Sequence, residues 1–246
     1  MSAAPIDIAT QHTAEFIARH APEQSAILEI GCGEGHLAQH LQGAGFTVIA
    51  IDANADAIAA TRAKGVDAHE AHWPDFKCNP VDIVIFTRSL HHIHDLDGAV
   101  SKAHAVLRDG GVLLVEDFAF NEADRKTMNW FAERLQTNSL APALSAPPDS
   151  FMADLMEAKE LGSVWESHHH HDLHEVAVMA KAIDKTFGTS EILNAPYLYR
   201  YLISCLEENV DAAVKLAAFK QQEEGAIAQR QIIPIGRRII AKKDMR

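Results

Sequence analysis

Three glycines at alternate positions, Gly31, Gly33 and Gly35, directly follow the apolar run AILEI at 26–30. Glycine permits a tight turn and lets backbone N–H groups at the start of a helix approach a bound ligand closely. Asp52 ends the next apolar run along the chain. The carboxyl ends of parallel strands meet at one edge of a sheet, so this carboxylate can accept both ribose hydroxyls of a nucleoside. The spacing predicts a nucleoside-containing ligand, although a glycine loop alone also fits a plain tight turn.

The position of the third glycine separates two classes of cofactor. A dinucleotide site has the spacing G-x-G-x-x-G, which puts Gly or Ala at position 36, where this sequence has His36. The observed G-x-G-x-G, with Glu29 two residues upstream, resembles motif I of the class I S-adenosylmethionine-dependent methyltransferases. The segments 82–93 and 105–117 resemble later motifs of that family, with SLHHI in the first and LRDGGVLLVED in the second. The likeness covers residues 27–118, and GRRIIAKK near the end resembles the family's last strand.

The resemblance implies an α/β, Rossmann-like fold with a seven-stranded, mostly parallel sheet in the order 3-2-1-4-5-7-6, strand 7 being antiparallel. It also implies S-adenosylmethionine as the cofactor and S-adenosylhomocysteine as the product. Carried over residue by residue, it assigns the methionine moiety to Glu29, Gly31, Gly33 and Gly35, the ribose to Asp52 and the vicinity of the adenine to Ala53.

The adenine side departs from the family pattern. Many relatives carry an Asp shortly before a Leu-Pro pair, whereas this chain has HEAHWP at 69–74. Glu70 or His69 can substitute for that Asp, and Trp73 either packs on the adenine ring or belongs to the core. Arg88, after the next apolar run, is expected to contact the cofactor or an anionic substrate.

His91 and His92 follow the run VDIVIF at 81–86 and are expected at its carboxyl end, beside the methyl group to be transferred. Histidine suits proton transfer near neutral pH, so both are candidate catalytic bases. A competing interpretation makes this pair a feature of the fold, with a ring packed against a neighbouring helix. Methyl transfer can also proceed by alignment alone, so a catalytic residue is not required.

Five further positions are candidates for the substrate pocket. Glu116 ends a strand and points into the pocket or toward solvent. His170 and His174 belong to the run HHHHDLH, which reads as an exposed helix start, a pocket wall or, least favoured, a metal site. Tyr199 and Tyr201 alternate on an expected strand, where they either face the acceptor or pack in the core. No metal is predicted.

These residues depend on elements that alternate between apolar runs and helix-like patterns, typical of a parallel α/β sheet. The expected strands are 26–30, 46–51, 81–86, 111–118, the start of 189–202 and 232–243, and the expected helices include 35–43, 54–64, 97–107 and 203–230. Residues 121–187 break this alternation and contain SLAPALSAPPDS. The chain is therefore expected to form a single methyltransferase domain of residues 1–246, with its core at about 22–120 and 188–246 and a helical cap or insertion at about 121–187.

The amino-acid composition limits the classes of molecule with which the protein is expected to interact. The 246 residues carry 22 Lys and Arg against 34 Asp and Glu, a net charge of −12, which argues against nucleic acid as partner. The absence of a long apolar run argues against a membrane span, and the N-terminus does not resemble a signal peptide, so a cytoplasmic location is expected. The expected acceptor is a small molecule. The alternatives are a protein acceptor, a non-catalytic module that binds the cofactor, or a nucleotide-dependent dehydrogenase, which His36 disfavours.

Overall fold

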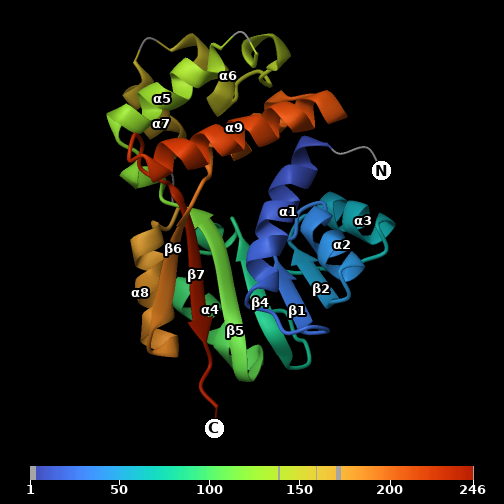
Figure 1. Ribbon diagram of the computed structural model, residues 1–246. Coiled ribbons are helices and arrows are strands. Elements are labelled where there is room, and N and C mark those ends of the chain that lie inside the picture. The colour runs from blue at the N-terminus through green and yellow to red at the C-terminus, as the bar shows by residue number, and fades with distance from the viewer. Residues whose placement is uncertain (1–3, 138, 159, 170–172, 246) are drawn as a thin grey trace. The chain divides into compact units, whose positions relative to one another are not determined.

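A seven-stranded sheet organises the computed structural model, which describes residues 4–137, 139–158, 160–169 and 173–245 (Figure 1). Its order is β3-β2-β1-β4-β5-β7-β6, with β7 antiparallel, as the family resemblance implied. The strands are β1 (Ala26–Ile30), β2 (Thr47–Asp52), β3 (Asp67–Glu70), β4 (Val81–Thr87), β5 (Leu107–Phe118), β6 (Ser190–Ala195) and β7 (Gly236–Lys242).

Most residues of the central strands are apolar because both faces of a parallel sheet are covered; the exceptions include Glu29 in β1 and Asp82 in β4. Strand β1 pairs in parallel with β2 on one side and β4 on the other, so that Ile30 stands opposite Ile51 and Phe86. This register brings the carboxyl ends of the three strands together. Asp52, at the end of β2, and the loops that carry the glycines and the histidine pair are thereby placed at one edge of the sheet.

The chain divides into two units, and the first, here called the sheet unit, comprises residues 10–117, 174–193 and 237–246. Its helices are the main part of α1 (Pro5–Ala18), α2 (His36–Gly43), α3 (Ala55–Ala63), α4 (Leu96–Val106) and α8 (Val176–Phe187). Phe16 and Ile17 of α1 share a buried cluster with Ile27 of β1 and Ile83 of β4, together with Leu41 of α2. Asn54 and Asp95 begin α3 and α4 as N-caps whose side chains accept backbone N–H groups.

The second unit, here called the helical unit, comprises residues 1–9, 118–173 and 194–236, as far as the structure describes them. It contains α5 (Arg125–Leu135), α6 (Phe151–Glu157), α7 (Leu161–His169), the 3₁₀ helix η4 (Leu198–Cys205) and α9 (Val210–Ala228). Its core is rich in aromatic rings. Phe118 stacks on Tyr197 with ring centroids 4.5 Å apart, and Tyr201 lies within 6.4 Å of the rings of Phe118, Phe131 and Trp165.

The observed division differs from the expected core and insertion in two places. Helix α8 belongs to the sheet unit, because it packs against α4 rather than against the other helices of the expected cap. Helices η4 and α9 belong to the helical unit, although both were expected in the core. Strand β3 and helix α1 have no counterpart among the expected elements. Within the described part of the chain, no helix combines the length and the apolar character that a membrane span requires.

Candidate functional site

The glycine loop is formed by three residues with left-handed backbone: Gly31 at φ +76°, Gly33 at +53° and Gly35 at +76°. A Cβ atom on Gly31 would lie 2.4 Å from Ser89 Cβ, and one on Gly35 would lie 2.5 Å from Thr61 Cγ2. These two glycines are therefore required for packing as well as for conformation. A Cβ atom on Gly33 would meet no described atom within 4 Å, so Gly33 is the glycine that faces open space.

Asp52 is held rigidly beside this loop. Its Oδ2 accepts a hydrogen bond from the Gly33 backbone N–H at 2.8 Å, and its Oδ1 accepts one from the Asn54 N–H at 2.9 Å. Both oxygens keep further lone pairs, because a carboxylate can accept about four hydrogen bonds. The carboxylate therefore has a fixed orientation and remaining capacity to accept from a ligand.

A pocket of about 540 Å³ opens at this edge, entirely within the sheet unit. Its described lining includes seven residues expected from the sequence: Gly31, Gly33, Asp52, Ala53, Trp73, Arg88 and His92. Glu29, Gly35 and Glu70 lie outside that lining. The sequence did not single out His94 and Asp95, which also line the pocket. The N-cap spacing from Asp95 to Gly98, at the start of α4, is the signal that locates them at the edge of the sheet.

Two buried polar atoms of opposite charge lack hydrogen-bond partners among the described residues. One is Oε2 of Glu29, whose residue is 1% exposed, and the other is Nη1 of Arg88. Arg88 Nη1 lies 3.6 Å from Glu116 Oε1, an ion pair beyond hydrogen-bond distance. Burial raises the pKa of Glu29 to about 8; the positive charge of Arg88 opposes this rise and the negative charge of Asp52 adds to it. Buried polar atoms without hydrogen-bond partners are costly, so both atoms are candidates for contact with a ligand.

Arg88 has an unusual backbone for a residue other than glycine, with φ +57°. Its N–H donates to the Glu116 carbonyl at 2.7 Å, which fixes this residue to the end of β5. Left-handed backbone at a non-glycine residue costs about 1–3 kcal/mol and is frequent at functional sites. The strained turn holds Arg88 in the pocket lining.

The two residues expected near the adenine, Trp73 and Glu70, differ in whether they line the pocket. Trp73 is buried, donates from Nε1 to the Ala99 carbonyl of α4 at 3.0 Å and contacts the Phe86 ring edge to face. It therefore combines the two interpretations, since it belongs to the core and also lines the pocket. Glu70 is exposed at the end of β3, paired in register with Asp52 but outside the pocket lining.

The histidine pair forms a 3₁₀ turn, η1 (Leu90–His92). His91 is 4% exposed, and its Nδ1 lies 2.7 and 2.8 Å from the two carboxylate oxygens of Asp117, at the end of β5. The His92 ring lies 4.1 Å from the His91 ring, centroid to centroid, and lines the pocket. Burial lowers the pKa of His92, the adjacent His91 lowers it further, and Asp117 opposes these effects. The turn thus contains one fixed buried histidine and one pocket histidine that favours its neutral form.

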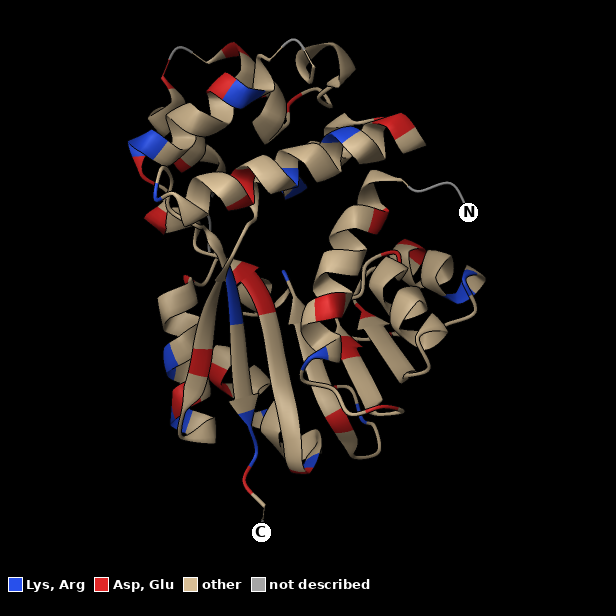
Figure 2. Cartoon of the chain, viewed as in Figure 1, with Lys and Arg blue, Asp and Glu red and all other residues tan. Residues whose placement is uncertain are grey.

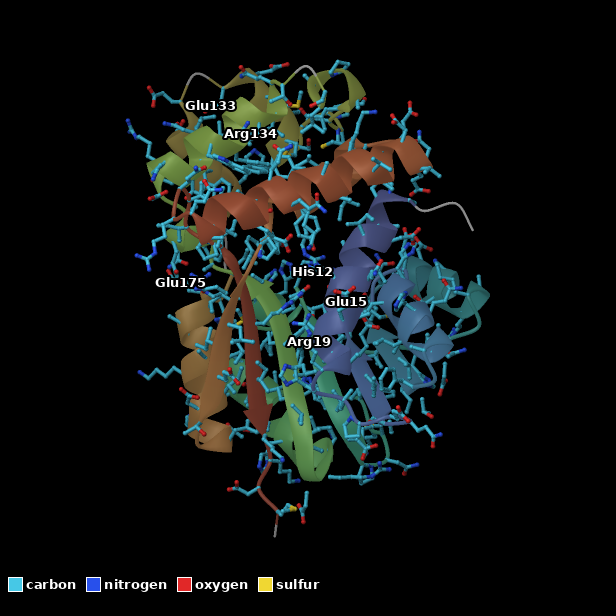
Figure 3. All side chains as sticks on the ribbon, viewed as in Figure 1. His12, Glu15, Arg19, Glu133, Arg134 and Glu175 are labelled. Atoms are coloured by element: carbon cyan, nitrogen blue, oxygen red, sulfur yellow. The ribbon has the colours of Figure 1, made fainter. Side chains whose placement is uncertain are left out.

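Glu116 has partners within the protein rather than a place in the pocket lining. Its Oε1 accepts from the Thr13 hydroxyl at 2.7 Å, and its Oε2 accepts from Arg238 Nε at 2.8 Å. Arg238 also donates to the carbonyl of His12 on α1 at 2.9 Å. In Figure 2 the acidic end of β5 lies beside the basic start of β7, and His12 is labelled in Figure 3. This network joins β5, β7 and α1.

The remaining substrate candidates fall in different places. His170 lies outside the described residues. His174 is in the sheet unit, where its Nε2 lies 3.0 Å from the Ile93 carbonyl. Tyr199 and Tyr201 lie on the 3₁₀ helix η4, so the strand expected for them is wrong, and Tyr199 is fully buried. The described residues contain no group of three His, Cys, Asp or Glu side chains placed to hold a metal ion.

Comparison with known proteins agrees with this geometry. The family model described as "Methyltransferase domain" matches residues 8–158. The chain is 30% identical over 99 residues to ubiquinone biosynthesis O-methyltransferase of Rhodopseudomonas palustris, a match covering 36% of this chain and 38% of that protein. It is 31% identical over 111 residues to malonyl-[acyl-carrier protein] O-methyltransferase of Yersinia pestis, covering 42% of this chain and 40% of that protein. The matches thus span about two fifths of either relative.

A solved structure shares the fold over nearly the whole chain. Phosphoethanolamine N-methyltransferase 2 of Haemonchus contortus, solved in complex with S-adenosyl-L-methionine, superposes with a TM-score of 0.57 at 15% identity. The superposition covers 96% of this chain and 53% of that one. Together with the match over residues 8–158, which is more than half of the sequence, this shows that the chain belongs to the class I S-adenosylmethionine-dependent methyltransferases.

Proposed function

We propose that this methyltransferase transfers the methyl group to a small-molecule acceptor, with the cofactor held in the pocket of the sheet unit. One observation carries the proposal. A single pocket of about 540 Å³ combines an open glycine, an anchored carboxylate with spare acceptor capacity and a histidine that favours its neutral form.

The residues present fit S-adenosylmethionine. Asp52 is suited to the ribose hydroxyls, and Ala53 and Trp73 provide an apolar border for the adenine. The amino-acid end of the cofactor carries one ammonium and one carboxylate group. Glu29 and Arg88 each have a buried polar atom without a hydrogen-bond partner in the described structure, and their charges are opposite to those two groups. Pairing would remove the cost of burying both atoms unpaired.

We assign His92 as the base that accepts a proton from the methyl acceptor. When bound, the cofactor would supply an electrophilic methyl group on a sulfonium to the acceptor atom and would leave as S-adenosylhomocysteine. His92, neutral near pH 7, accepts the proton that an acceptor hydroxyl or ammonium must lose. His91 is held by Asp117, and its ring packs against the His92 ring and helps to position it.

The acceptor class follows from charge and from the relatives. A net charge of −12 disfavours a nucleic acid, whose phosphates require clustered Lys and Arg. The two relatives compared above are named as O-methyltransferases of ubiquinone biosynthesis and of malonyl-[acyl-carrier protein]. We therefore place a small organic acceptor first and a carrier-bound or protein acceptor second.

Calorimetry with S-adenosylhomocysteine and with NAD tests the cofactor, and methyl transfer from labelled S-adenosylmethionine into a metabolite extract tests the acceptor. We expect binding of S-adenosylhomocysteine alone and label in the small-molecule fraction. Asp52→Ala should weaken binding by about 1.5–3 kcal/mol for each charge-assisted bond lost. Binding of NAD alone would overturn the cofactor assignment, and label only in macromolecules would overturn the acceptor class. Tight binding without transfer to any fraction would favour a non-catalytic module.

A further inference from the structure

We propose that His174 is a positioning residue, which holds the turn at residues 90–93 in the shape that lines the cofactor pocket. His174 lies 81 residues beyond Ile93 in the sequence, yet both belong to the sheet unit. Its importance for binding rests on the proposed function, whereas its effect on the turn does not.

Two hydrogen bonds join His174 to this turn. The His174 backbone N–H donates to the His91 carbonyl at 3.0 Å, and the ring Nε2 lies 3.0 Å from the Ile93 carbonyl. A carbonyl oxygen only accepts, so Nε2 carries the hydrogen in this contact. His174 therefore binds the turn through its main chain and its side chain together.

The turn needs support at this end because its own hydrogen bonds are few. Within it, the His92 N–H donates to the Ser89 carbonyl at 3.2 Å and the Ile93 N–H to the Leu90 carbonyl at 3.1 Å. The last carbonyls of a short helical turn have no partner within the turn. His174 supplies partners for two such carbonyls, those of His91 and Ile93.

The other end of the turn is already fixed. The Ser89 hydroxyl donates to the Ile30 carbonyl at the end of β1 at 2.6 Å, and the Arg88 N–H donates to the Glu116 carbonyl at the end of β5. His91 is attached by its ring to Asp117. These contacts fix residues 88–91, whereas the part of the pocket lining at residues 92–95 comes after them and depends on His174.

The helix that follows His174 is packed firmly within the sheet unit. Glu175, labelled in Figure 3, is the N-cap of α8, which begins directly after it. Helix α8 buries Met179 and Ile183 and packs against α4, the helix that continues the chain from the turn. The rings of Phe187 on α8 and His104 on α4 lie 4.9 Å apart. Helix α8 thus supports both the turn, through His174, and the helix that follows the turn.

The side-chain contact can be removed selectively. The amide nitrogen of Gln reaches about as far as Nε2 of His, whereas that of Asn corresponds to Nδ1. His174→Gln should therefore keep the bond to Ile93, and His174→Ala and His174→Asn should lose it. All three variants retain the backbone bond to His91. His168→Ala is the matched control, because His168 contacts the exposed carboxylate of Asp154 in the helical unit at 2.7 Å.

The experiment measures amide hydrogen exchange at His92 and Ile93, together with calorimetric binding of S-adenosylhomocysteine, in the full chain. A net hydrogen bond of ordinary strength corresponds to about two- to tenfold in an equilibrium. We expect His174→Ala and His174→Asn to lose about that factor in protection at these two amides and in affinity, and His174→Gln and His168→Ala to match the wild type.

Unchanged exchange and affinity in folded His174→Ala would overturn the proposal, as would equal behaviour of the Asn and Gln variants. A wild-type protein that does not bind S-adenosylhomocysteine would overturn the proposed function instead. In that case, the amide exchange of the turn would still test the role of His174.

Discussion

Glu29 and Glu223 are both buried carboxylates with 1% exposure, one in each unit, but their surroundings differ. Glu223 on α9 accepts backbone N–H groups from Tyr197 at 2.6 Å, Leu198 at 2.9 Å and Tyr199 at 3.0 Å, so both of its oxygens have partners. Glu29 on β1 has an Oε2 without a hydrogen-bond partner in the described structure.

The difference separates a carboxylate that stabilises the fold from one that we propose binds the cofactor. Burial raises the pKa of Glu223 to about 7 and that of Glu29 to about 8, and the three N–H donors limit the rise at Glu223. A raised pKa by itself therefore does not identify a site. The distinguishing observation is the unpaired oxygen of Glu29, which lies beside a pocket and near the opposite charge of Arg88. Glu223 instead fixes the start of η4.

The largest effect is expected at Glu223. Glu223→Ala leaves three buried backbone N–H groups without acceptors. At about 1–3 kcal/mol for each group, the free energy of unfolding should fall by at least about 3 kcal/mol. Urea denaturation at pH 6 measures this loss. Glu29→Gln in the same assay serves as the comparison, and it should not destabilise the protein, because it removes no hydrogen bond to Oε2. Equal losses in the two variants would show that the carboxylates do not differ in role.

The second prediction concerns ligand binding, for which substitution of Glu29 should have a larger effect than substitution of Glu223. Glu29→Gln removes the charge that pairs with the ammonium group, so affinity for S-adenosylhomocysteine should fall by about 1.5–3 kcal/mol. Affinity for 5′-methylthioadenosine, which lacks the amino-acid end, should stay within about threefold of the wild type. Calorimetry with both ligands makes the measurement. A comparable loss for both ligands would indicate a general distortion of the pocket instead of recognition of the ammonium group.

The third effect is a pH dependence of binding. In the free protein, Glu29 holds its proton below about pH 8, and it must release that proton to pair with an ammonium group. Affinity for S-adenosylhomocysteine should therefore fall as the pH drops below 8, by up to about 1.4 kcal/mol per pH unit, and level off above it. Calorimetry in buffers of different ionisation enthalpy would detect the released proton between pH 6 and 8. Glu29→Gln should abolish this proton release; its persistence in that variant would assign the release to another group.

The strands were predicted correctly where burial of both sheet faces produces a recognisable run of apolar residues. The runs that form β1, β2 and β4 are mostly apolar because both sheet faces are covered, and their expected limits lie within one residue of the observed ones. Strand β3, with the sequence DAHE, has no such run, because it is short and at the edge of the sheet. The strand expected around Tyr199 failed for a different reason: alternating tyrosines resemble a half-buried strand, but Glu223 holds this segment as a 3₁₀ helix.

The sequence by itself indicated the family through its motifs, and the resemblance to that family implied the order of the sheet. The sequence also placed the glycine loop beside Asp52, because the spacing of glycines and the apolar runs of buried strands are local patterns. The tertiary structure alone decided that α8 joins the sheet unit, that Glu116 bonds to Thr13 and Arg238, and that His174 bonds to the turn of His91. Each of these outcomes pairs residues 80 or more positions apart, or joins helices from separate segments. No local pattern encodes such pairings, because they arise only when the packed elements bring the side chains together.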